Sequence, residues 1–165
     1  MIGLVCGVAL LGQVELKGNP PRNPALHRTW VAVAVPQGTP KPKLTLEPSM
    51  RFTMVSTGPK KADNFRITGL YKLEKADEAV KALYKSGSYV YLYTDLANAK
   101  KLGMPAAEVA RLKKEGKKWQ LMTRFVFDPT IPILTDVMTT NFAPVGGEAE
   151  AMRRYNERMQ EFRGQ

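Results

Sequence analysis

The chain has 165 residues, of which 44% are hydrophobic, so it is long enough to bury one ordinary hydrophobic core. Its 25 Lys and Arg outnumber its 15 Asp and Glu, and the formal net charge of +10 favours anionic partners such as nucleic acid, acidic proteins or anionic lipid. Cys6 and His27 are the only residues of their types, which excludes a disulfide within the chain and a structural zinc site, because such a site needs about four ligands.

The first segment, residues 2–16, has the periodicity of a strand. Its even positions are apolar, whereas Gln13, Glu15 and Lys17 occupy odd positions; the apolar set is Ile2, Leu4, Cys6, Val8, Leu10, Val14 and Leu16. A period of two lets a pleated strand bury one face, so we expect a strand here. A signal peptide is the alternative, but the segment lacks a basic start and a convincing small-residue cleavage site. No run approaches the roughly 18 apolar residues of a membrane span.

Proline and glycine interrupt the next part of the chain, up to residue 60. Two short strands are predicted there, over residues 29–36 (TWVAVAVP) and 50–56 (MRFTMVS). Between them, residues 37–48 (QGTPKPKLTLEP) are predicted to be extended and polyproline-like, because their prolines oppose both a helix and a sheet ladder. Residues 1–60 are therefore interpreted as an N-terminal arm of β-strands and proline-rich segments.

The middle of the chain changes to alternating strand and helix patterns. A helix over residues 75–87 follows from its apolar spacing and Gly87, and residues 96–116 form a helix or a broken pair that ends at Gly116. β-branched and aromatic content predicts three strands, over residues 64–72, 88–94 and 117–127. The order β-α-β-α-β predicts an α+β fold, a small mixed sheet with two helices on one face, with residues 61–128 as a basic core domain.

Residues 129–165 are predicted to be an extended tail that leads to a C-terminal amphipathic helix. The tail is interrupted by prolines, and the helix carries apolar residues three and four positions apart, namely Met152, Tyr155, Met159 and Phe162. Glu150 precedes Arg154 by four residues, the favourable order for an ion pair. This stripe is more often packed on the parent core, but the tail would also let the helix pack on a partner.

Catalytic motifs are absent from the sequence. It contains no G-x-S-x-G, P-loop, H-E-x-x-H or dinucleotide fingerprint, and Cys6 lies in an apolar run where a thiol is commonly inert. Asp77 and Glu78 are adjacent and belong to a first helical turn, where carboxylates favour the helix dipole. The sequence predicts no enzyme, no cofactor and no metal site.

Two features are candidates for binding a partner. Tyr89, Tyr91 and Tyr93 share one face of a strand, which fits a stacking platform for single-stranded nucleic acid, although a half-buried sheet face explains them as well. The second feature is a basic run at a helix end, with Arg111 followed by Lys113, Lys114, Lys117, Lys118 and Trp119. Residues 60–124 hold fifteen Lys and Arg against seven Asp and Glu, so the charge excess is regional.

Residues 64–125 resemble the CpcD-like domain of phycobilisome linker polypeptides. Phe65, Arg66, Gly69 and Leu70 would match its first strand, Ser88, Tyr89 and Val90 its second, and Arg111, Gly116, Lys118 and Trp119 its last helix and strand. The helical insert over residues 74–85 and the absence of the larger linker domain depart from that family. The resemblance implies a non-catalytic peg that caps rings of acidic light-harvesting proteins, with Cys6 as a conceivable bilin attachment.

The function predicted from the sequence is a structural or linker subunit that docks a basic module on acidic protein partners, phycobiliproteins among the candidates. A single-stranded nucleic-acid binder is the alternative, as is a subunit of a virion or photosynthetic complex. Partner contacts are expected at Arg66, Tyr89, Tyr91, Arg111, Lys113, Lys114, Lys117, Lys118 and Trp119, and at the stripe formed by Met152, Tyr155, Met159 and Phe162. Plastid stroma or cyanobacterial cytoplasm would follow from the linker resemblance.

Overall fold

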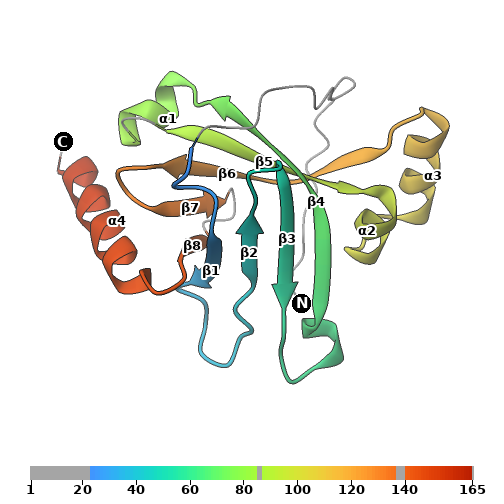
Figure 1. Ribbon diagram of the computed structural model, residues 1–165, viewed down its shortest axis with the longest axis horizontal. Coiled ribbons are helices and arrows are strands. Elements are labelled where there is room, and N and C mark those ends of the chain that lie inside the picture. The colour runs from blue at the N-terminus through green and yellow to red at the C-terminus, as the bar shows by residue number, and fades with distance from the viewer. Residues whose placement is uncertain (1–22, 85–86, 137–139, 165) are drawn as a thin grey trace.

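The fold is a closed barrel of eight antiparallel strands in a computed structural model that describes residues 23–84, 87–136 and 140–164. Each strand pairs with the next along the chain, and β8 closes the barrel on β1 (Figure 1). The strands are β1 (Thr29–Val33), β2 (Lys43–Leu46), β3 (Arg51–Ser56), β4 (Phe65–Lys75), β5 (Ser88–Asp95), β6 (Trp119–Asp128), β7 (Ile133–Asp136) and β8 (Asn141–Pro144).

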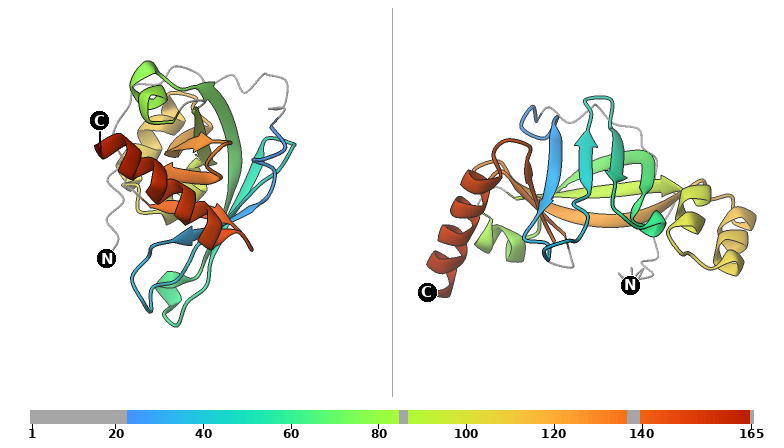
Figure 2. Two further views of the ribbon diagram at one scale, coloured as in Figure 1. Left: turned by 90° about the vertical axis from the view of Figure 1, so that its left-hand side faces the viewer. Right: turned by 90° about the horizontal axis from the view of Figure 1, so that it is seen from below.

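The helices lie around the strands rather than in a layer of their own. They are the 3-10 turn η1 (Lys61–Asp63) and the helices α1 (Glu78–Leu83), α2 (Leu96–Lys101), α3 (Ala106–Lys114) and α4 (Glu148–Arg163). Along the longest axis, α4 lies at one end of the barrel and the α2–α3 pair at the other (Figures 1 and 2). Among the described residues, no helix has the length and apolar content to cross a membrane.

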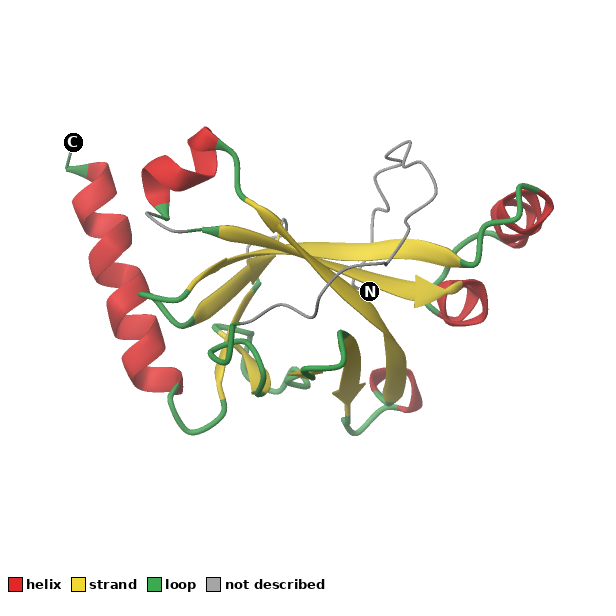
Figure 3. Cartoon of the chain, turned by 45° about the horizontal axis from the view of Figure 1, so that its top comes forward, coloured by secondary structure: helices red, strands yellow, loops and turns green. Residues whose placement is uncertain are grey.

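The predicted α+β fold is wrong. The expected strands and helices of residues 64–128 are present in the expected order, but their strands are antiparallel and belong to a barrel, and the helices are connections at its rim rather than a cover on one face (Figure 3). β3 pairs with β4 and β6 with β7, so hydrogen bonds cross both expected domain boundaries. One barrel therefore takes strands from residues 1–60, 61–128 and 129–165 alike.

Three strands account for the error. Residues 43–46, predicted to be polyproline-like, form β2, and the predicted tail contains β7 and β8. Each of these strands is only four residues long, short enough to fit next to a proline such as Pro42 or Pro132. The strand predicted over residues 2–16 lies outside the described residues, whereas the strands near residues 29–36 and 50–56 are confirmed.

Side chains from all eight strands fill the interior of the barrel. The largest fully buried ones are Trp30, Phe52, Tyr71, Phe125 and Phe127. Trp30 meets Phe127 edge to face, with 5.8 Å between the ring centroids, and its indole N–H donates to the carbonyl of Leu26. An eight-stranded barrel is just wide enough for side chains to fill it. The interior is thus a packed core, and partner binding is to be sought on the outside.

β4 bends in the middle because its first half pairs with β3 and its second half pairs with β5. Residues 65–70 pair with β3, whereas residues 69–75 pair with β5. At the crossing, a Cβ atom added to Gly69 would lie 2.0 Å from the Tyr93 carbonyl oxygen and 2.6 Å from the Phe52 ring. Only glycine permits this close approach of two strands and a core ring.

We expect Gly69→Ala to lower the free energy of unfolding by about 2–3 kcal/mol, because the methyl group overlaps backbone that cannot move aside. Gly147→Ala is the matched control, since its Cβ atom would lie at least 3.7 Å from other atoms. Urea unfolding followed by tryptophan fluorescence measures both variants. Equal stability of the two variants would contradict the crossing described above.

Candidate functional site

The α2–α3 helical hairpin projects from the barrel at the end of β5 and the start of β6. β4 stops pairing with β5 at Gly69, opposite Thr94, while β5 and β6 continue together to the pair Asp95 and Trp119. The hairpin connects these two strand ends, so it stands clear of the barrel on the right of Figure 1. Asn98 of α2 also donates to the Thr68 carbonyl at 3.5 Å, which ties the hairpin to β4.

The hairpin has a small core of its own. Leu96, Val109 and Leu112 are at most 6% exposed and pack together with Met104, separately from the barrel core. Asp95 caps α2 by accepting from the Asn98 N–H at 2.7 Å, and α3 ends at Gly116, whose φ is +72°. The predicted left-handed glycine at the end of this helix is confirmed. These features hold the hairpin as a defined unit.

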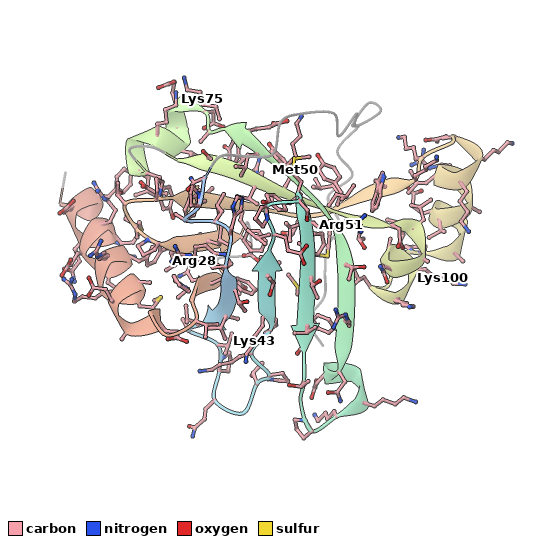
Figure 4. The ribbon with its side chains drawn as sticks, viewed as in Figure 1. Arg28, Lys43, Met50, Arg51, Lys75 and Lys100 are labelled. Carbon is pink, nitrogen blue, oxygen red and sulfur yellow. The ribbon has the colours of Figure 1, made fainter. Side chains whose placement is uncertain are left out.

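Lysines cover the outside of this hairpin. Between residues 96 and 118 there are seven Lys or Arg against two Glu. Five lysines are exposed and, among the residues that the structure describes, form no ion pair; they are Lys100, Lys101, Lys113, Lys114 and Lys118. We call these five residues the lysine cluster. Figure 4 labels Lys100 at this end of the molecule, away from Lys43.

Arg111 and Lys117 differ from the lysine cluster because acidic neighbours already compensate them. Arg111 bridges Glu108 at 2.6 Å and also contacts Glu115, and this pairing raises the pKa of Arg111 and lowers that of Glu108. Lys117 lies 3.3 Å from Glu115. Exposed ion pairs of this kind add little stability. Because Arg111 and Lys117 use the two glutamates, the positive charge of the lysine cluster stays uncompensated on the hairpin.

The tyrosines of β5 point outward, as expected, but two of the three rings are covered. Tyr89 is 7% exposed and Tyr93 is 4% exposed, whereas Tyr91 is intermediate. Tyr89 donates to the Asp77 carboxylate at 2.6 Å, and the Arg124 guanidinium lies over its ring at 4.5 Å. The hydrogen bond raises the pKa of Tyr89 and lowers that of Asp77. A row of three free stacking rings is therefore not available on this face.

The predicted C-terminal helix is confirmed as α4, and its stripe faces the barrel at its start. Ala151 and Met152 pack on Val33 and Ala143, and the predicted pair of Glu150 and Arg154 is present at 2.7 Å. Tyr155 hydrogen bonds to Tyr84, and burial of Tyr84 raises the pKa of its phenol. Met159 is intermediate, and Phe162, near the helix end, is 49% exposed. Met152 and Tyr155 thus have partners within the chain, whereas Phe162 is exposed.

The structure separates the predicted contact residues into distinct surfaces. Arg111, Lys113, Lys114, Lys117, Lys118 and Trp119 lie on the hairpin or at its base, and the α4 stripe lies at the opposite end of the long axis (Figure 2). Tyr89 and Tyr91 belong to the outer face of β5, and Arg66 is exposed on the half of β4 that pairs with β3. Sequence reasoning missed Lys100 and Lys101, although both end a predicted helix whose next neighbour is the basic α3.

Potential metal-ligating side chains are dispersed among the described residues. No group of three His, Cys, Asp or Glu side chains in residues 23–84, 87–136 and 140–164 is arranged to hold a metal ion. The Nε2 atom of His27 is buried without a hydrogen-bond partner there. Cys6 lies outside the described residues.

Comparison with known proteins gives no match: no family model, no curated protein and no solved structure is similar to this chain. The resemblance of residues 64–125 to the CpcD-like domain therefore stays a prediction.

We expect Leu112→Ala to loosen the hairpin without unfolding the barrel, because Leu112 belongs to the separate small core. Loss of a buried leucine costs about 2–5 kcal/mol. Amide hydrogen exchange in α2 and α3 should accelerate, while exchange in β1–β4 stays slow. Ala110→Gly, at an exposed position of α3, is a control for helix propensity alone and should cost about 1 kcal/mol. Equal acceleration throughout the barrel would show that the hairpin is not a separate unit.

The bond between Tyr89 and Asp77 predicts a dependence of stability on pH. The folded pKa of Asp77 is lowered mainly by this bond, so the stabilisation is complete above the unfolded pKa of about 3.9 and is lost as the pH falls through the lower folded pKa. We expect Tyr89→Phe to make the urea midpoint less sensitive to acidification below about pH 4. Tyr91→Phe, which removes the neighbouring hydroxyl, should retain the sensitivity of the unmodified chain.

Proposed function

We propose that this protein is a non-enzymatic assembly subunit that docks its basic hairpin on an acidic protein partner. The barrel supplies a rigid body, and the α2–α3 hairpin presents the docking surface at one end of it. The lysine cluster is the observation that carries the proposal. Five exposed lysines that have no acidic partner among the described residues repel one another, and a complementary negative surface relieves that repulsion.

The pairing of charges on the C-terminal helix contrasts with the lysine cluster. On α4, Arg153 contacts both Glu150 and Glu157 at 2.6–2.7 Å, and Arg158 lies 3.5 Å from Glu161. Arg153, Arg154 and Arg158 of α4 thus have glutamate partners in the same helix, whereas the lysine cluster has no acidic partner among the described residues. Electrostatic complementarity of this kind steers association and selects the partner.

A protein partner fits this surface better than single-stranded nucleic acid. Single-strand binders combine a basic groove with exposed aromatic rings on which bases stack. Here Tyr89 and Tyr93 are covered, and Tyr89 is engaged by Asp77 and Arg124. Phycobiliproteins remain among the acidic partners predicted from the sequence resemblance, and this identification rests on that resemblance alone.

We expect Lys113→Glu with Lys114→Glu to weaken recovery of the acidic partner about tenfold or more, because each reversal places like charges together. Native purification followed by mass spectrometry and lysine cross-linking identifies and quantifies the partner. Lys60→Glu with Lys61→Glu is the matched control, since these adjacent lysines are also exposed but lie on the β3–β4 connection, at the bottom of Figure 1. This control should retain the partner.

Two other results would contradict the proposal. The first is a loss of partner of the same size in both double variants, which would indicate dependence on net charge alone. The second is binding to a single-stranded oligonucleotide with a steep decrease in affinity as salt rises, in the absence of any protein partner.

A further inference from the structure

One edge of the sheet is open beside the lysine cluster. β6 pairs with β5 along its whole length, but β7 pairs only with residues 125–127. Among the residues that the structure describes, no strand pairs with the other edge of β6 between Trp119 and Arg124, and no further hydrogen bond from these six residues leads elsewhere in the chain. In such an edge strand, alternate residues direct their N–H and C=O groups away from the sheet.

A second open edge, on β4, is partly closed by side chains. Residues 65–68 of β4 pair with β3 but not with β5. The Thr68 carbonyl there accepts from the Thr94 hydroxyl at 3.2 Å and from the Asn98 amide at 3.5 Å. The β6 edge has only one such contact, from the Gln120 side-chain amide to the adjacent Leu121 carbonyl at 3.4 Å. It is therefore the more available of the two.

The charges around the β6 edge determine what can occupy it. Lys118 precedes Trp119 directly and is exposed, and the lysines of α3 belong to the same hairpin. Natural proteins place lysine at sheet edges to prevent pairing with another copy of themselves. A second copy of this chain also carries a net charge of +10, so like charges oppose edge-to-edge pairing of two copies. The same charges attract an acidic strand.

We infer that an extended acidic peptide segment of the partner adds to the edge of β6 at residues 119–124 as a further antiparallel or parallel strand. This inference rests on the proposed function and specifies how the hairpin's partner is held. Main-chain hydrogen bonds would supply affinity, and the lysine cluster would supply selectivity for acidic side chains. The lysines thus select acidic segments, and the backbone of β6 binds them.

The outer side chains of β6 specify the pattern of this segment. Leu121 lies opposite Tyr93, and Trp119 lies opposite Asp95, on the outward face of the paired strands β5 and β6. The sheet has a bulge beyond Leu121, after which Arg124 lies opposite Tyr91. Cross-strand neighbours of Trp119 and Leu121 should be apolar, and a neighbour of Arg124 or Lys118 should be acidic. The segment therefore alternates apolar and acidic residues.

An eight-residue peptide of alternating glutamate and valine tests the inference on the whole chain. We expect amide hydrogen exchange, followed by NMR, to become about tenfold slower at alternate residues of 119–124 when this peptide binds. The control is the same peptide with every amide N-methylated, which keeps the charge and removes all backbone donors. Lys118→Glu should weaken binding of the unmodified peptide about two- to fivefold, whereas Lys60→Glu should leave it unchanged.

Each other outcome has a defined meaning. Equal binding of both peptides without slower exchange would overturn strand addition and leave the electrostatic docking of the proposed function standing. Failure of both peptides to bind would also overturn strand addition, while recovery of the native partner decides the proposed function separately. Slow exchange at residues 119–124 in the free chain would overturn the inference as well, because the edge would then already be occupied.

Discussion

The crossing of β4 at Gly69 determines the rest of the architecture. Up to about this residue β4 pairs with β3, and beyond it β4 pairs with β5. The direction of the sheet therefore changes within one strand. The absence of a side chain allows the Tyr93 carbonyl and the Phe52 ring to come close at that point. β4 stays paired with β5 as far as Thr94, one residue before β5 ends at Asp95, and α2 follows directly. The hairpin therefore begins where the pairing of β4 with β5 ends, whereas the open edge of β6 arises because β7 pairs only with residues 125–127.

The elements that the sequence predicted correctly are those whose side chains carry a clear period. β4, β5 and β6 are long enough for alternation to be read, and α4 shows its apolar spacing over sixteen residues. β2, β7 and β8 have four residues each, too few for a period, and nearby prolines suggested extended or irregular chain. Closure of the barrel depends on those three short strands. The fold class therefore could not be derived from the segments that were easiest to predict.

The candidate site was predictable in part for a related reason. Lys113, Lys114 and Lys118 fall within a six-residue segment of the sequence, so their charge is evident without a structure. Whether these lysines have acidic partners depends on the side-chain positions of Glu108 and Glu115. Both of these glutamates form ion pairs with Arg111. The tyrosines of β5 share a face as expected, but the position of Asp77 and Arg124 over Tyr89 comes from pairing between distant segments. The period of a strand identifies which side chains share a face, but it does not show which residues from distant segments cover that face.

The contrast between the two ends of the molecule shows why net charge alone is a poor guide to a docking surface. The helix α4 holds Arg153 and Arg154 in close contact with Glu150, so these charges are compensated within one helix. On the hairpin, Arg111 contacts both Glu108 and Glu115, and the lysine cluster has no acidic partner among the described residues. Exposed paired charges are neutral at a distance, whereas a cluster of one sign extends its field over about a Debye length, roughly 8–10 Å in physiological salt. The lysine cluster lies on the connection between β5 and β6, and its member Lys118 directly precedes the edge of β6 at residues 119–124, which no described strand pairs.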